Sequence, residues 1–166
     1  MTVGDGPMTP AIAAAHAAGL AHRVVRTALP DSAEDSARLQ EIPLGALLRT
    51  IVVRRGADDY VFVLVPVGRR LDWPKLRAHL GVKRLSLPDA DEALAATGYA
   101  RFSITPFGAS HAWPVVADAS AMEQPIVSVG GGVRGVNIHA APADLVATLA
   151  AEVADITTAQ DHAHQH

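Results

Sequence analysis

The sequence RTIVVRRGADDYVFVLVP, which occupies residues 49–66, predicts a β-hairpin. Its two halves, 49–54 and 59–66, are rich in Val, Ile, Tyr and Phe, and these residue types favour β-strands. The Gly-Ala-Asp segment at 56–58 is typical of the turn in a hairpin. Two adjacent antiparallel strands are therefore the part of the fold that the sequence specifies most directly.

Helix and strand signals alternate irregularly on both sides of this hairpin. Asp72 precedes a segment that has proline in its first turn and Gly81 at its end, which is typical of a helix. Ser32 and Asp35 have the spacing of a capping box, and a further capped helix is expected to begin at Asp89. The helices are too few and too unevenly spaced for a regular β-α-β series. The sequence therefore predicts a mixed α/β (α+β) single domain, with a curved, partly barrel-like mixed sheet surrounded by short helices. Helices are expected at 9–20, 31–40, 72–81, 89–97 and 142–151, and further strands at 23–28, 83–87, 114–117, 126–129 and 136–140.

The composition is that of a globular protein. The chain has 166 residues, 49% hydrophobic and 19% charged, so it can bury one sizeable core. No stretch approaches the roughly 18 apolar residues of a membrane span, and the N-terminus lacks the basic and apolar blocks of a secretory signal. We therefore expect a cytoplasmic protein with no membrane partner. Cysteine is absent, which excludes disulfides, thiol catalysis and Cys-based zinc sites.

Three segments are expected along the chain. Residues 1–22 are expected to form an N-terminal helix and arm, residues 23–156 the main domain, and residues 157–166 a disordered polar tail. Alternating histidines on that tail can bind metal ions only loosely. The other histidines are dispersed, without a carboxylate at ligand spacing, so the sequence predicts no metal site.

Positive charge is concentrated in one part of the sequence. Between Arg49 and Arg84 lie nine of the 14 basic residues and three acids, although the whole chain has a net charge of -3. Such clustering can follow a phosphate backbone by electrostatic attraction. Alternatively, these side chains solvate strand ends and one helix face. The sequence leaves both interpretations open.

Glycine marks two stretches that are expected to carry the chemistry, residues 97–108 and 127–137. Glycine and proline turns can expose backbone N–H groups, which bind an oxyanion without a side-chain nucleophile. Residues 130–135 also match the G-x-G-x-x-G spacing of dinucleotide-binding loops, but a strand is expected after them where that motif requires a helix. A tight hairpin bordering a pocket is the better interpretation, and no cofactor is predicted.

Several motifs together resemble the YbaK/EbsC family, which includes domains that edit misacylated prolyl tRNA. The resemblance covers about residues 23–156, and the motifs occur in the order expected for the family. They are LRTIVV (48–53), FVLVP (62–66), LDWPKL (71–76), TGY (97–99), ITPFG (104–108), PVVAD (114–118) and GGVRG (131–135).

The resemblance implies hydrolysis of the ester between a wrong amino acid and the 3′ end of tRNA, with a prolyl-tRNA synthetase as a candidate partner. An aminoacyl ester is already activated, so backbone donors, one water and the substrate's own ribose hydroxyl can suffice. The implied catalytic residues are Arg49, Thr105, Pro106, Phe107 and Gly108. The implied substrate-binding residues are Thr50, Phe102, Ser103, Ile104, Gly131, Gly132 and Asn137.

Three positions depart from the family pattern. Arg49 replaces a lysine, Phe102 a glycine, and Asn137 an acidic residue. Arginine keeps the charge but presents a planar fork instead of a compact ammonium. One interpretation is an editing hydrolase with a pocket that Phe102 narrows for small amino acids such as Ala or Cys on prolyl tRNA. The other is a catalytically weak module that binds tRNA or a synthetase through the basic segment. For Phe102 itself, the alternative to a role in the pocket is a core side chain on a strand.

Overall fold

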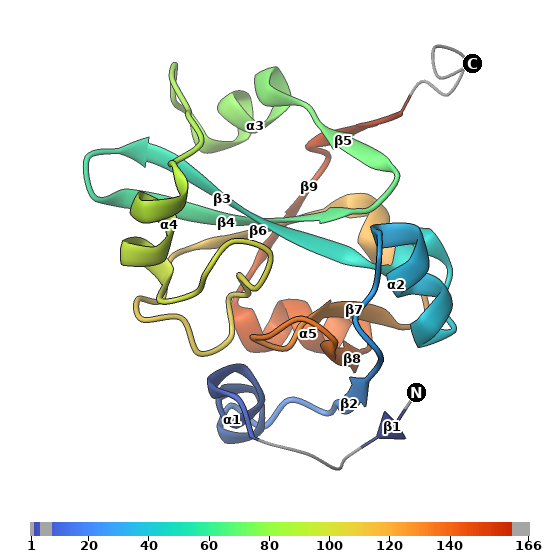
Figure 1. The fold of residues 1–166 in the computed structure, drawn as a ribbon. Coiled ribbons are helices and arrows are strands. Elements are labelled where there is room, and N and C mark those ends of the chain that lie inside the picture. Colours follow the sequence, from blue (N-terminus) through green and yellow to red (C-terminus); the bar gives the residue numbers. More distant parts are fainter. Residues whose placement is uncertain (1, 4–7, 161–166) are drawn as a thin grey trace.

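The structure, a computed structural model, describes residues 2–3 and 8–160 and places most strands in two four-stranded sheets (Figure 1). The first sheet has the order β1-β2-β8-β7 and is antiparallel. The second has the order β3-β4-β6-β9, in which β3 pairs antiparallel with β4 and the other neighbours are parallel. β5 and β10 form a short antiparallel pair. The strands are β1 (Thr2–Val3), β2 (Arg23–Arg26), β3 (Leu48–Gly56), β4 (Asp59–Pro66), β5 (Arg69–Leu71), β6 (Val115–Asp118), β7 (Val127–Gly130), β8 (Val136–Ala140), β9 (Glu152–Ala154) and β10 (Thr157–Ala159).

The helices of the described residues begin largely where the sequence predicts caps. The side chains of Ser32, Asp72 and Asp89 each accept a hydrogen bond from the amide three residues further on, at 2.8–3.0 Å, which satisfies a donor that the first helical turn leaves unpaired. The α-helices are α1 (Pro10–Ala17), α2 (Ala33–Gln40), α3 (Trp73–Leu80), α4 (Ala90–Thr97) and α5 (Pro142–Leu149), with short 3-10 helices at Leu44–Ala46 and Ala119–Glu123. None of the helices in this part of the chain has the length and apolar character needed to cross a membrane.

The main core lies between the two four-stranded sheets. It contains Leu48 and Leu64 from the second sheet, and Val129 and Ile138 from the first. A second cluster fills the space between the opposite face of the second sheet and α3, which lies above that sheet in Figure 1. The sheets approach each other at an isolated bridge between Leu47 and Ser128, but they do not close into a barrel. The predicted mixed α/β single domain with a curved sheet is confirmed.

The prediction of a strand at residues 83–87 is wrong. Ser86 makes only an isolated bridge with Arg54, through two backbone hydrogen bonds of 2.8 and 3.1 Å. Lys83, Arg84 and Leu87 are exposed, so this segment has no buried face that would extend the pairing.

The prediction of a disordered tail from residue 157 is also wrong for its first part. Thr157 is fully buried, and β10 pairs with β5 in the register that places it opposite Leu71. The Nε atom of Arg69 donates to the hydroxyl of Thr157 at 2.6 Å. These bonds compensate the cost of ordering the segment. Residues 161–166, with their alternating histidines, lie outside the described residues.

Candidate active site

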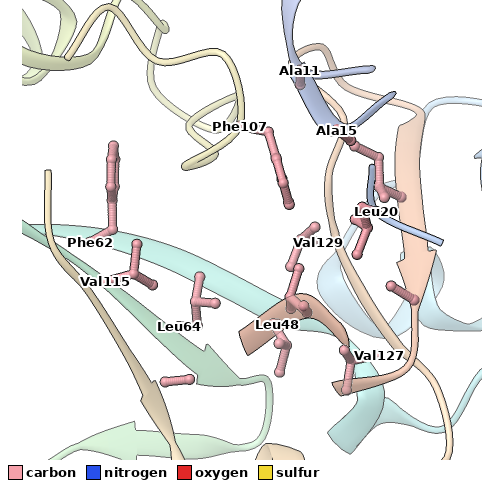
Figure 2. Close-up of a cluster of buried hydrophobic side chains, with 14 of the residues drawn as sticks. Ala11, Ala15, Leu20, Leu48, Phe62, Leu64, Phe107, Val115, Val127 and Val129 are labelled. Atoms are coloured by element: carbon pink, nitrogen blue, oxygen red, sulfur yellow. The ribbon is translucent and has the colours of Figure 1, made fainter. Parts of the chain in front are cut away.

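The two glycine-bearing stretches meet in space. We call residues 105–108 the bend and residues 130–135, which join β7 to β8, the glycine loop. A Cβ atom built on Gly130 would lie 3.7 Å from the carbonyl oxygen of Ile104 and 3.9 Å from the Cβ of Thr105. Figure 2 shows the ring of Phe107 pointing from its loop into the main core toward Val129 of β7. The core thus holds the two loops against each other.

The glycine loop is the turn of a hairpin, as predicted, and not the start of a helix. The amide of Gly131 donates to the carbonyl of Val136 at 2.8 Å, and the amide of Val136 donates to the carbonyl of Val133 at 3.2 Å. These bonds leave no helix N-terminus to receive a pyrophosphate. The G-x-G-x-x-G spacing therefore marks a hairpin turn here and not a dinucleotide-binding loop.

The start of α1 packs on both loops, which sequence reasoning did not predict. The hydroxyl of Thr9, the N-cap residue of α1, donates to the carbonyl of Gly131 at 2.6 Å. A Cβ atom on Gly108 would lie only 2.6 Å from the carbonyl oxygen of Pro10. The pattern at residues 9 and 10 indicates a helix start, but nothing in it indicates which loops that helix start contacts.

Two buried hydroxyls fix the orientation of one peptide unit in each loop. The hydroxyl of Tyr99 donates to the carbonyl of Phe107 at 2.6 Å, and burial raises the pKa of Tyr99, so this proton stays in place at neutral pH. Because a trans peptide unit is planar, the N–H of Gly108 points away from Tyr99. The bond from Thr9 to the carbonyl of Gly131 directs the N–H of Gly132 away from Thr9 in the same way.

Several amides at these loops make no hydrogen bond to the part of the protein that the structure describes; of their residues, Gly108 is exposed and Gly132 is buried. The amide of Phe107 donates to the hydroxyl of Thr105 at 3.4 Å. Within residues 8–160, the N–H groups of Gly108, Ala109 and Gly132 donate to no protein acceptor. Thr105 and Phe107 are themselves buried, whereas Gly108 is exposed. The bend therefore offers backbone donors at its C-terminal end, while its side chains anchor it in the core.

Thr50 lies on the core-facing side of β3. It shares that side with Leu48 and Val52, both members of the main core. Its hydroxyl oxygen is buried and has no hydrogen-bond partner among the described residues. A buried polar atom without a partner is rare and calls for an explanation, and Thr50 is one of the predicted substrate-binding residues.

Arg49 is exposed and lies on the opposite side of β3, which it shares with Ile51 and Val53. In the part of the chain that the structure describes, its guanidinium makes no hydrogen bond or ion pair. The structure therefore brings Thr50, but not the side chain of Arg49, to the face of β3 that looks into the main core. A catalytic role of Arg49 stays a prediction.

Phe102 differs from both interpretations that the sequence allowed. Its side chain is 81% exposed and its φ angle is 70°, so it is neither a core residue on a strand nor the wall of a narrowed pocket. The guanidinium carbon of Arg101 lies 5.4 Å from the centre of its ring. Ser103 and Ile104, which follow it, are half-buried and lead into the bend.

Asn137 has a structural partner. It is buried on β8, opposite Gly130, and its Nδ2 atom donates to the carbonyl of Val25 at 3.3 Å. This bond joins β8 to β2 and leaves the side chain little freedom to reach a ligand. Gly131 is also buried, and a Cβ atom there would lie 2.6 Å from the side chain of Val136.

The basic segment is partly neutralised by ion pairs. Four of its nine cations pair with acids at 3.0–3.8 Å, which supports the interpretation that these side chains solvate the edges of the fold. The other five make no ion pair among the described residues, so a smaller set remains for phosphate groups. The paired cations are Arg54, Arg55, Arg69 and Lys75, and the other five are Arg49, Arg70, Arg77, Lys83 and Arg84.

A buried polar cluster lies behind the glycine loop, and sequence reasoning did not find it. The side-chain oxygen of Gln40 bonds the hydroxyl of Ser128 at 2.6 Å and the Nε2 atom of His139 at 2.8 Å. Burial, and to a lesser extent the charge of Arg23, lowers the pKa of His139. This cluster fastens α2 to β7 and β8.

Two hollows of about 480 and 610 Å³ lie elsewhere. The first is lined by Tyr60, Glu92 and Trp113 among others, the second by His22 and His139 among others. Neither includes the bend or the glycine loop. The described residues also contain no group of three or more His, Asp or Glu side chains placed to hold a metal ion.

Comparison with known proteins agrees with this geometry. The family model described as "Aminoacyl-tRNA editing domain" matches residues 27–148. The chain belongs to this family. Its members are aminoacyl-tRNA deacylases, and the resemblance to YbaK/EbsC proteins is thereby confirmed. The match excludes α1, although α1 contacts both loops of the site.

Two curated relatives are similar to this editing domain. The "Putative Cys-tRNA(Pro)/Cys-tRNA(Cys) deacylase EbsC" of Enterococcus faecalis is 28% identical over 127 residues, which cover 76% of this chain and 77% of that protein. The "Proline--tRNA ligase" of Thermosipho africanus is 32% identical over 98 residues, which cover 59% of this chain and only 17% of that enzyme.

A solved structure described as a "putative trans-editing enzyme for prolyl tRNA synthetase" has the same fold. Its TM-score is 0.81, with 24% sequence identity, and the alignment covers 93% of this chain and all of that chain. The β-sheets and helices of the editing domain are therefore shared along nearly the whole chain.

Proposed function

We propose that this editing domain hydrolyses the ester of a mischarged tRNA in trans, and that it removes a small amino acid such as Ala or Cys from prolyl tRNA. The observation that carries the proposal is the pair of oriented, free amides of Gly108 and Gly132 on two loops that touch. The proposal extends to a cytoplasmic location and to a prolyl-tRNA synthetase as partner. The choice of prolyl tRNA is supported by the two curated relatives, because one is described as a deacylase of Cys-tRNA(Pro) and the other as a proline--tRNA ligase.

The proposed reaction needs no side-chain nucleophile. A water oxygen forms a bond to the ester carbonyl carbon, and the carbonyl oxygen becomes an oxyanion that the free amides of the bend and the glycine loop stabilise. The bond from this carbon to the ribose oxygen then breaks. The ribose oxygen takes up one proton of the attacking water, the second proton passes to solvent, and the amino acid leaves as its carboxylate. The neighbouring ribose hydroxyl orients the water.

Thr50 and Arg49 have different roles in this proposal. The buried, unpartnered hydroxyl of Thr50 is available to hold the water or the amino-acid moiety on the core side of β3. The exposed Arg49 is suited to attract the phosphate next to the terminal ribose, because its guanidinium forms no ion pair with an acidic side chain of the described chain.

The proposal is tested with purified protein and tRNAs mischarged with Ala, Cys, Ser and Thr. We expect at least one, and Ala or Cys first, to be deacylated faster than in buffer. Tyr99→Phe keeps the ring but removes the hydroxyl that orients the Phe107–Gly108 peptide unit, so this variant is expected to deacylate more slowly than wild type. Background rates on all four substrates with a folded protein would refute the proposed hydrolysis.

A second candidate function is a catalytically weak module that binds tRNA or a synthetase. The five cations without ion pairs favour it. Arg49→Ala distinguishes the two, with Arg70→Ala as control, since Arg70 is also exposed but lies on β5. Turnover in the wild type that falls in Arg49→Ala supports hydrolysis, whereas lost affinity without any turnover in the wild type supports binding alone.

A further inference from the structure

Phe102 is the most conspicuous side chain outside the two loops. At 81% it is the most exposed of the large apolar side chains in the described chain. Its φ angle of 70° is also unusual, because a bulky residue rarely adopts the left-handed region. The other non-glycine residues with positive φ are small or polar residues at helix ends or in a turn. Glu41 and Ala150 end helices α2 and α5, and Asp58 lies in the turn between β3 and β4.

Local contacts hold Phe102 in this conformation. The amide of Ser103 donates to the carbonyl of Ala100 at 3.0 Å, which closes a turn around residues 101 and 102. The amide of Ser110 donates to the carbonyl of Thr97 at 2.9 Å, so the segment that carries Phe102 is fastened at its far end to the last turn of α4. An exposed aromatic ring on a strained, anchored turn points to a function, because neither packing nor turn formation requires it there.

The surroundings of the ring favour a nucleic-acid base. The Arg101 guanidinium carbon lies 5.4 Å from the ring centre, and it adds a positive charge beside a flat apolar surface. Single-stranded nucleic acids bind to this combination, in which bases stack on aromatic rings and cations attract the phosphates. A protein partner would instead gain most from a wider apolar patch. The neighbour of Phe102, Arg101, is charged and exposed, so it does not extend such a patch.

The position along the chain identifies the base. Phe102 precedes Thr105 by three residues, so its Cα lies within about 10 Å of the start of the bend, the reach of three extended residues. The proposed ester is attached to the terminal ribose, and the base on that ribose is the nucleobase nearest to the bend. We infer that Phe102 stacks on the base of the nucleotide that carries the amino acid and so positions the ester at the bend. This inference rests on the proposed function.

The test uses a short single-stranded RNA with 2-aminopurine as its 3′-terminal base. Stacking on an aromatic ring quenches this fluorophore, so we expect wild-type protein and Phe102→Trp to quench it on binding. Phe102→Leu keeps an apolar side chain without a ring and is expected to abolish quenching and to raise the Kd about 5- to 100-fold, the usual contribution of one stacked base. Leu87→Ala, which removes another exposed apolar side chain (59%), is the matched control and is expected to bind as wild type.

Stability is controlled with Phe102→Gly, because glycine adopts positive φ without strain and this variant is expected to melt no lower than wild type. In deacylation assays Phe102→Leu is expected to raise KM with little change in kcat. If Phe102→Leu quenches the fluorophore as strongly as wild type and has the wild-type KM, the inference is overturned. The proposed hydrolysis would be unaffected by that result. Quenching that depends on Phe102, in a protein that deacylates none of the mischarged tRNAs, would instead support the stacking contact and refute the proposed function.

Discussion

Replacing Thr50 by valine is expected to raise stability and lower activity at the same time. The hydroxyl of Thr50 is buried without a partner in the described chain, on the same side of β3 as Leu48 and Val52. An unsatisfied buried polar group costs about 1–3 kcal/mol. Valine has the same shape, and the added methyl contributes up to about 0.8 kcal/mol of apolar burial. We therefore expect Thr50→Val to increase the free energy of unfolding by about 1–2 kcal/mol.

A gain of this size raises the Tm by about 2–8 °C for a chain of this length. If the hydroxyl holds the water or the substrate in the transition state, the deacylation rate should fall about 10- to 100-fold, which corresponds to about 1.4–2.7 kcal/mol. Thermal or urea unfolding gives the first quantity, and release of labelled amino acid from mischarged tRNA gives the second.

Thr50→Ser serves as the control, because it keeps the hydroxyl and removes the methyl. It should lose stability and keep most of its activity. Two results would refute the reasoning about Thr50. A lower Tm in Thr50→Val would mean that the hydroxyl has a partner in solution, and an unchanged deacylation rate would mean that it plays no part in the reaction.

Two further predictions concern the packing behind the site and its pH dependence. Gly108 and Gly19 both have positive φ. A Cβ atom on Gly108 would lie 2.6 Å from the Pro10 carbonyl oxygen and 2.8 Å from the Tyr99 hydroxyl, whereas a Cβ atom on Gly19 would have no neighbour within 4 Å. Gly19→Ala should cost about 1 kcal/mol in urea unfolding and Gly108→Ala several times more; equal losses would contradict the close approach. The pKa of His139 is lowered by burial, so the unfolded chain binds more protons than the folded one and stability should fall as the pH drops below about 6.5. His139→Gln should flatten this dependence of the urea midpoint between pH 7 and 5, and an unchanged slope would show that another group causes it.

Local signals made much of the fold predictable. The caps at Ser32, Asp72 and Asp89 were identified because a short polar side chain before an apolar run can satisfy the free amides of a helix start. The hairpin of β3 and β4 was identified because strand-forming residues flank a turn. In both cases the structure depends on residues that are close in sequence.

The elements that sequence reasoning missed depend on distant partners. β5 and β10 are three residues each and exist because they pair with each other across 88 positions, as the bond from Arg69 to Thr157 shows. β9 is likewise defined by its parallel pairing with β6. For Phe102, an apolar side chain usually predicts burial, and nothing in the sequence indicated that the ring lies on an exposed turn with positive φ.

The same distinction applies to the candidate site. The motifs placed the bend and the glycine loop correctly as backbone features, but they do not show how their peptide units are oriented. That orientation comes from two hydroxyls, of Tyr99 within the motif segment and of Thr9 outside the family match. Each hydroxyl binds the carbonyl of one peptide unit and so directs the N–H of the same unit to the other side. Because an oxyanion is stabilised by donors that are fixed before the reaction, α1 has to be counted as part of the site, even though its sequence resembles nothing more than a capped, alanine-rich helix.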